Sequence, residues 1–134
     1  MATNIFINLP VRDLQKSIHF FTHLGYSFNQ HYTDDSATCM IVDENIFVML
    51  LTETRFKEFT PKPISDAHTS TEVLVCLQAP SRDAVTTLVS KAIEAGGRTY
   101  KEPQDRGFMY GHGFEDLDGH LWELVYMSGE LPTD

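Results

Sequence analysis

The stretch that decides the fold of this chain is Asp116-Leu117-Asp118-Gly119-His120-Leu121-Trp122-Glu123-Leu124. Asp118-Gly119 is a turn signal, and it joins two strand-like runs, 108–114 and 121–127. These runs complete a pattern that occurs twice along the 134 residues, namely a strand, a helix and three further strands. The sequence therefore predicts an α+β fold made of two tandem βαβββ modules.

The first module is expected at about residues 1–52. A strand over 4–9 precedes a helix that Asp13 can cap and Gly25 can end. Three strands are then expected at 26–32, 37–42 and 46–51.

The second module, at about residues 71–128, repeats this order. Its helix follows Pro80, and its strands are expected at 72–77, 98–100, 108–114 and 121–127. The polar stretch 53–70 is interpreted as a linker within a single domain, 1–134. Because neither module can bury its own sheet face, the two halves are expected to pack their sheets together.

Composition narrows the possible functions. Ten Lys and Arg against nineteen Asp and Glu give a net charge of −9, which disfavours nucleic acids and anionic membranes as partners. Apolar runs such as 46–51 are too short to span a bilayer. The first residues lack the pattern of a signal peptide, so we expect a cytoplasmic protein. Cys39 and Cys76 lie in apolar strand contexts and are expected to be buried, reduced thiols.

Two motifs carry a family resemblance. The stretch 116–124, together with Asn8-Leu9-Pro10-Val11-Arg12-Asp13-Leu14 and the following Leu24-Gly25, resembles the vicinal oxygen chelate superfamily. That superfamily includes glyoxalase I, bleomycin resistance proteins and extradiol dioxygenases, and this chain is most similar to the small glyoxalase-like, predicted lactoylglutathione lyase proteins. The resemblance implies paired modules whose curved sheets surround a cleft, a small-molecule ligand and a homodimer.

Glu123 is the first candidate catalytic residue. It is the single carboxylate in an apolar run, and an ionised carboxylate there needs a metal ion, a basic side chain or a proton. The resemblance implies that this position holds the metal ligand of the last strand. The structural alternatives are a carboxylate that pairs with Arg or Lys, or one that reaches an exposed strand edge.

The other ligand positions of the family depart from its pattern. Phe6 stands where a glyoxalase carries a ligand on the first strand, and Val48 or Met49 replaces the Glu of the fourth. The fifth strand offers Glu72 or Leu74, depending on its register. At most Glu72 and Glu123 remain as metal ligands, whereas catalytic metal sites usually use three or more. We therefore expect at most a weakly bound divalent metal, and no full nickel or zinc site.

His112 is the second candidate catalytic residue, because glycines on both sides leave room for a ligand and imidazole suits acid–base work. A glycine-flanked histidine without a role is the alternative. His19 and His23 have metal-like spacing, but they share a polar helix face and are interpreted as solvated.

Aromatic and soft side chains on the predicted strands suggest a pocket for an apolar or planar ligand. The candidate ligand-binding residues are Phe6, Phe47, Met49, Phe108, Tyr110 and Trp122. Each could instead belong to the core. The net charge favours a cationic ligand over conjugates of glutathione or coenzyme A.

Two functional hypotheses follow. The first is an enzyme of glyoxalase type, a lyase or isomerase in which Glu123 and a weakly held divalent ion stabilise an enolate while a base moves the proton. The second is a metal-independent protein that binds and sequesters a small molecule, like bleomycin resistance proteins. The sequence leaves open whether the chain is an enzyme.

Overall fold

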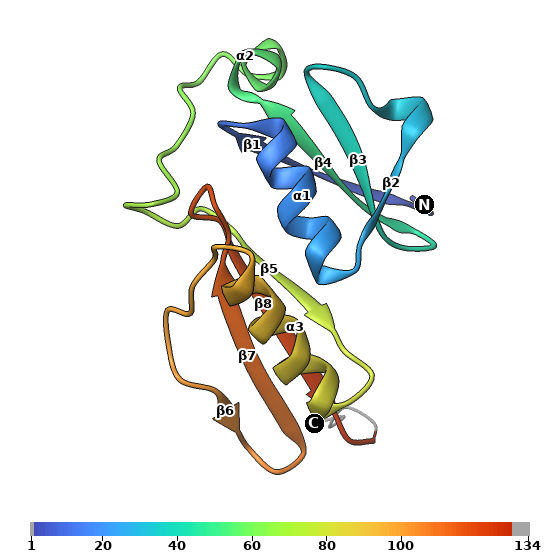
Figure 1. Ribbon diagram of the computed structural model, residues 1–134, viewed down its shortest axis with the longest axis vertical. Coiled ribbons are helices and arrows are strands. Elements are labelled where there is room, and N and C mark those ends of the chain that lie inside the picture. The colour runs from blue at the N-terminus through green and yellow to red at the C-terminus, as the bar shows by residue number, and fades with distance from the viewer. Residues whose placement is uncertain (1, 130–134) are drawn as a thin grey trace. The chain divides into compact units, whose positions relative to one another are not determined.

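The computed structural model describes residues 2–129, and the chain divides into two compact units, Met1–Ser65 and Asp66–Asp134 (Figure 1). Each unit contains one four-stranded sheet and one long helix. The predicted α+β class and the strand, helix and three-strand order of both halves are confirmed.

The first unit has the sheet order β1-β4-β3-β2, in which β1 runs parallel to β4 and the other pairs are antiparallel. Its elements are β1 (Ile5–Val11), α1 (Leu14–Leu24), β2 (Ser27–Asn29), the 3₁₀ helix η1 (Gln30–Tyr32), β3 (Ala37–Asp43) and β4 (Ile46–Thr52). Asp13 caps α1 by accepting a hydrogen bond from the Lys16 backbone N–H, and Gly25, with φ of 107°, ends it.

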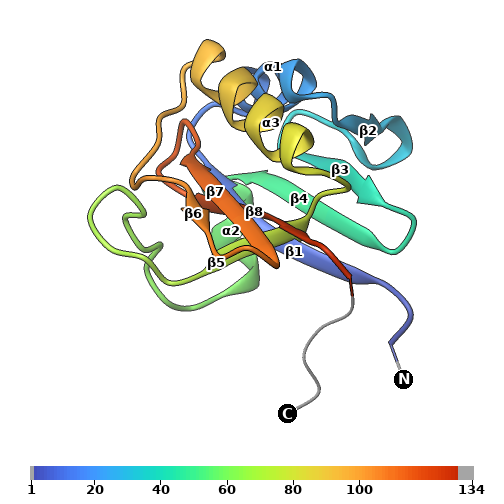
Figure 2. The same ribbon diagram turned by 90° about the horizontal axis from the view of Figure 1, so that it is seen from below.

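One face of this sheet is covered by α1, as Figure 2 shows. The helix buries Phe20 and Phe21, while the sheet supplies Val48 and Leu50, which are fully buried. Strand residues alternate between faces, so Phe47 and Met49 on β4 lie on the face away from α1.

The second unit has the matching sheet order β5-β8-β7-β6. Its elements are β5 (Leu74–Gln78), α3 (Arg82–Glu94), β6 (Gln104–Asp105), β7 (Met109–Glu115) and β8 (Leu121–Met127). Ser81 caps α3 through the Ala84 backbone N–H at 3.0 Å. Trp122 is 1% exposed and stacks on Phe114, so the face covered by α3 forms the core of this unit.

The turn between β7 and β8 is organised by Asp116, which is 6% exposed. Its carboxylate accepts hydrogen bonds from the backbone N–H groups of Asp118 (2.9 Å) and His120 (3.0 Å). The other carboxylate oxygen accepts from Nε1 of Trp122 at 2.9 Å. The motif that decides the fold therefore couples a tight turn to the largest side chain of the core.

Several local predictions differ from the structure. The expected linker contains the short helices α2 (Glu53–Phe56) and η2 (Lys57–Phe59). Residues 98–100 form only an isolated bridge from Arg98 to Glu115, and the fourth strand of that sheet is β6 instead. Cys39 is buried as expected, but Cys76 is exposed because β5 is an edge strand and Cys76 lies on its face away from α3.

Within residues 2–129, no helix is long and apolar enough to cross a membrane.

Candidate functional site

A row of four side chains crosses the first sheet on the face away from α1. The strand registers pair Asn8 with Met49, Met49 with Cys39, and Cys39 with Asn29. The row therefore places two apolar side chains between two amides, one on each outer strand.

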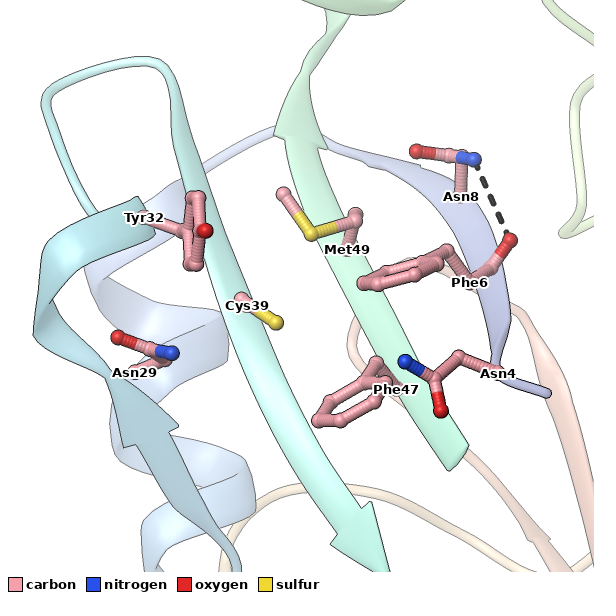
Figure 3. Close-up of a pocket in the computed structure, with 8 residues that line it drawn as sticks. All are labelled: Asn4, Phe6, Asn8, Asn29, Tyr32, Cys39, Phe47 and Met49. Carbon is pink, nitrogen blue, oxygen red and sulfur yellow. Dashed lines mark hydrogen bonds between the residues drawn. The ribbon is translucent and has the colours of Figure 1, made fainter. Parts of the chain in front are cut away.

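This row lies in a pocket of about 570 Å³ (Figure 3). The Phe6 and Phe47 rings stack beside it, with their centroids 5.0 Å apart and their planes inclined by 17°. Phe6 is 54% exposed, which leaves one side of the stack accessible. The pocket is lined by Asn4, Phe6, Asn8, Asn29, Tyr32, Cys39, Phe47 and Met49. Three predicted ligand-binding residues, Phe6, Phe47 and Met49, are thus brought together.

None of the eight lining side chains is charged. Burial raises the pKa of the Cys39 thiol, which therefore stays neutral. Polar contacts can come from the amides and from the exposed Tyr32 hydroxyl. These polar residues are not among those predicted from the sequence, although the parallel alignment of the first and fourth strands pairs Asn8 with Met49.

Glu123 holds the corresponding place in the second sheet. It lies on the central strand β8, on the face away from α3, opposite Cys76 on β5 and Gly113 on β7. Its side chain is 20% exposed, and Oε1 lies 3.1 Å from Nζ of Lys101. The carboxylate is expected to need a metal ion, a basic side chain or a proton, and the structure places a basic side chain, Lys101, beside it.

Tyr100 completes this cluster. A Cβ at Gly113 would lie 2.6 Å from Oε2 of Glu123 and 2.7 Å from Oη of Tyr100, so only glycine leaves room for both groups. The Tyr100 hydroxyl is buried and, among the residues described, has no hydrogen-bond partner. Burial first, and then the Glu123 charge, raise the pKa of Tyr100, so the hydroxyl remains a protonated donor. The same two causes raise the pKa of the Cys76 thiol.

The predicted metal ligands do not come together. β5 begins at Leu74, so Glu72 lies outside the strand, and Cys76 is the residue paired with Glu123. In the first sheet Met49, rather than Val48, holds the position that corresponds to Glu123 in the second. Its thioether offers no charge to a hard cation. No group of three or more His, Cys, Asp or Glu residues that could hold a metal occurs in the part of the chain that the structure describes. The donor set around Glu123 does not fit a divalent metal.

His112 lies on the other face of the sheet from Glu123. It pairs with Leu124, and neighbouring residues on a strand point to opposite faces. Its Nε2–H donates to the Lys101 carbonyl at 3.0 Å, because a carbonyl can only accept. The structure therefore does not bring the two predicted catalytic residues together on one face.

The remaining predicted ligand-binding residues also lie elsewhere. Trp122 belongs to the core, where its indole N–H bonds Asp116. Tyr110 lies on the same face of the sheet as Trp122, with the Arg82 guanidinium 5.2 Å from its ring centroid. Phe108 is 51% exposed and precedes β7. These three residues belong to the second unit and are not among the residues that line the pocket of the first.

Comparisons with known proteins extend this description. The family model of the Glyoxalase/Bleomycin resistance protein/Dioxygenase superfamily matches residues 5–124. A comparison with curated proteins found no match.

Among solved structures, a hypothetical protein from S. aureus is similar at 29% identity, with a TM-score of 0.79, covering 94% of this chain and 95% of that one. A glyoxalase-related enzyme from Fulvimarina pelagi has a TM-score of 0.79 at 15% identity, covering 94% and 88%. The fosfomycin resistance protein FosX from Listeria monocytogenes has a TM-score of 0.68 at 18% identity, covering 98% and 96%. The last two likenesses show the shared fold.

Proposed function

This chain belongs to the glyoxalase/bleomycin resistance protein/dioxygenase superfamily, and on that premise we propose that it binds and sequesters a small planar compound without a metal. The proposed site is the pocket on the face of the first sheet away from α1 (Figure 3). The observation that carries the proposal is the accessible Phe6–Phe47 stack, which lies beside a row of uncharged side chains. Such a surface favours aromatic compounds, which can extend the stack at an offset.

The pairing of Glu123 supports metal independence. The Lys101 ammonium lies 3.1 Å from the carboxylate and supplies the positive charge that a divalent ion would otherwise bring. A metal at this carboxylate would have to displace Lys101 and would find Cys76 and Gly113 as its neighbours.

The second candidate function is an enzyme of glyoxalase type, a lyase or isomerase. It is favoured by the buried Tyr100 hydroxyl, a protonated donor that lies beside the Glu123 carboxylate. In this reaction Glu123 would take a proton from the carbon next to a substrate carbonyl. Where that carbon bears a hydroxyl, Tyr100 would donate a hydrogen bond to the enediolate oxygen that forms, and Glu123 would return the proton to the former carbonyl carbon. The hydroxyl proton would pass to the former carbonyl oxygen, which leaves the new carbonyl on the first carbon.

The test of binding is calorimetry with planar aromatic probes, in the presence of a chelator. We expect micromolar binding to the wild type, and about a tenfold loss for Phe47→Ala, because the variant loses half of the stack. Phe59→Ala is the matched control, since Phe59 is 65% exposed and lies outside the pocket. Equal losses in both variants, or binding that requires added metal, would contradict the proposal.

The same preparation decides between the two candidates. The hemithioacetal of glutathione and methylglyoxal is offered as substrate to the chelator-treated wild type and to Glu123→Gln. Turnover by the wild type that the variant loses would establish the enzyme, whereas binding without turnover would support the sequestering protein.

We also propose a symmetric homodimer. Both sheets end in an edge strand with exposed apolar residues, Ile5 at 52% on β1 and Leu74 at 52% on β5. Edge strands of this kind are usually covered by another chain or element. Light scattering after size exclusion should give twice the 15.2 kDa of one chain, and a species of 15.2 kDa at micromolar concentration would refute the dimer.

A further inference from the structure

We propose that the compound bound by this pocket is uncharged, planar and polar at both ends, with a hydrogen-bond acceptor at the β2 side and a donor at the β1 side. This inference rests on the proposed binding function and names its ligand class. It follows from the amides of Asn8 and Asn29, which lie at opposite sides of the pocket in Figure 3 with Cys39 and Met49 between them.

Each amide has one half already engaged. Oδ1 of Asn29 accepts the His31 backbone N–H at 3.0 Å, as the cap of η1, so Nδ2 is the half left to donate to a ligand. Nδ2 of Asn8 donates one of its two N–H groups to the Phe6 carbonyl at 3.5 Å, whereas Oδ1 is the atom of this amide that is left entirely to accept from a ligand. The two amides are therefore not equivalent, and together they specify the direction of the ligand.

The row also sets the length of the ligand. Asn8 and Asn29 are three strand spacings apart, which is about 14 Å at about 4.8 Å per spacing. A hydrogen bond of about 2.9 Å at each end leaves about 8 Å between the two polar atoms of the ligand. The middle of the ligand would rest on Met49 and Cys39, which offer no charge.

A neutral ligand is the consequence of this lining. A charged group would lose its hydration in a pocket whose eight side chains provide no opposite charge. The net charge of the whole chain, −9, gave the opposite expectation of a cationic ligand. The lining residues determine which ligand charge the pocket accepts, because they lie within contact distance of the ligand. Exposed charges elsewhere on the chain are screened by salt over about a Debye length.

The test compares 6-hydroxy-2-acetonaphthone, whose carbonyl and hydroxyl have about this separation, with unsubstituted naphthalene and with the cation N-methylquinolinium. Binding to the full chain is measured by calorimetry. We expect the two-ended probe to bind at least about tenfold more tightly than either of the others, since each satisfied amide contributes a net hydrogen bond.

Asn29→Asp tests the direction of the ligand. An aspartate keeps the oxygen that caps η1 but replaces the donating half by a second acceptor, so the fold should be retained. We expect it to bind the acetonaphthone about tenfold more weakly, and to prefer 2,6-dihydroxynaphthalene, which can donate at that end. Asn45→Asp, in the turn between β3 and β4, introduces the same charge outside the pocket and should change neither affinity.

The outcomes separate this inference from the proposed function. If naphthalene binds as tightly as the two-ended probe, or if Asn29→Asp behaves like Asn45→Asp, the inference is wrong and the binding function stands. Tighter binding of N-methylquinolinium would also overturn the inference. If the wild type binds no planar probe, both are overturned.

Discussion

Asp116→Asn should destabilise the second unit strongly, although it changes a single atom. The carboxylate accepts two backbone N–H groups through one oxygen and the Trp122 indole N–H through the other, at 2.9 Å. An asparagine can place its oxygen on only one side. In either orientation its NH₂ group then faces an N–H donor inside the protein, where Asp116 is 6% exposed.

The magnitude follows from this geometry. The variant loses at least one charge-assisted hydrogen bond and leaves a buried donor without an acceptor, which together cost about 2 to 4 kcal/mol. Trp122→Phe removes the indole donor from the other side. In the double variant no indole N–H faces the asparagine, so the two losses should be less than additive by about 1 kcal/mol or more.

Urea unfolding of the wild type, both single variants and the double variant measures these terms. Burial raises the pKa of Asp116, so the series is repeated at increasing pH above the ordinary carboxyl range, and the stated cost applies where the carboxylate is ionised. If Asp116→Asn stays within about 0.5 kcal/mol of the wild type, or the two single losses add, the reasoning about this turn is refuted.

Three further predictions concern the second unit. Gly113→Ala should cost about 1 to 3 kcal/mol, because its Cβ would clash with the backbone carbonyl oxygen of Trp122 and lie 2.7 Å from the Tyr100 hydroxyl. Gly111→Ala, with 3.5 Å to its nearest neighbour, should be close to neutral in the same urea assay. Lys101→Met should lose about 1 kcal/mol or less, since Lys101 is 45% exposed. Manganese should shift the melting temperature of neither this variant nor the wild type, because the donors that remain around Glu123 do not fit a divalent ion, and a shift in the variant alone would contradict that conclusion. Arg82 lowers the pKa of Asp105 to about 2, so the pair supports β6 above the ordinary value of 3.8 and is lost as the pH falls through about 2. Hydrogen exchange of β6 amides should show that step, and Asp105→Asn should abolish it.

Much of the fold could be predicted because its signals are local. The caps at Asp13 and Gly25 lie next to the helix they limit, and the turn at Asp118-Gly119 adjoins both of its strands. The sequence predicts a strand over 98–100, but there only Arg98 pairs with β7, in an isolated bridge to Glu115, and the strand that pairs with β7 is Gln104–Asp105, beyond Pro103.

The candidate site was less predictable because it depends on pairing between distant strands. The partner of Glu123 is Lys101, which lies far from it in sequence, in the segment between α3 and β6. His112 and Glu123 both lie on predicted strands, and only the register between those strands places them on opposite faces. Phe6, Phe47 and Met49 could be predicted to lie together. Side chains alternate between the two faces of a strand, and the parallel pairing of the first and fourth strands puts these three on the same face.

The correspondence between Met49 and Glu123 suggests how such a chain could acquire a new specificity. Both occupy an inner strand of their four-stranded sheet, facing away from the helix, yet one presents a thioether and the other a carboxylate. Met49→Glu would place a negative charge between the two pocket amides, with no lysine among the lining residues to neutralise it. A pocket that binds neutral compounds would then select cations. The second sheet already carries a carboxylate at this position, so it shows which substitution would change the specificity of the first.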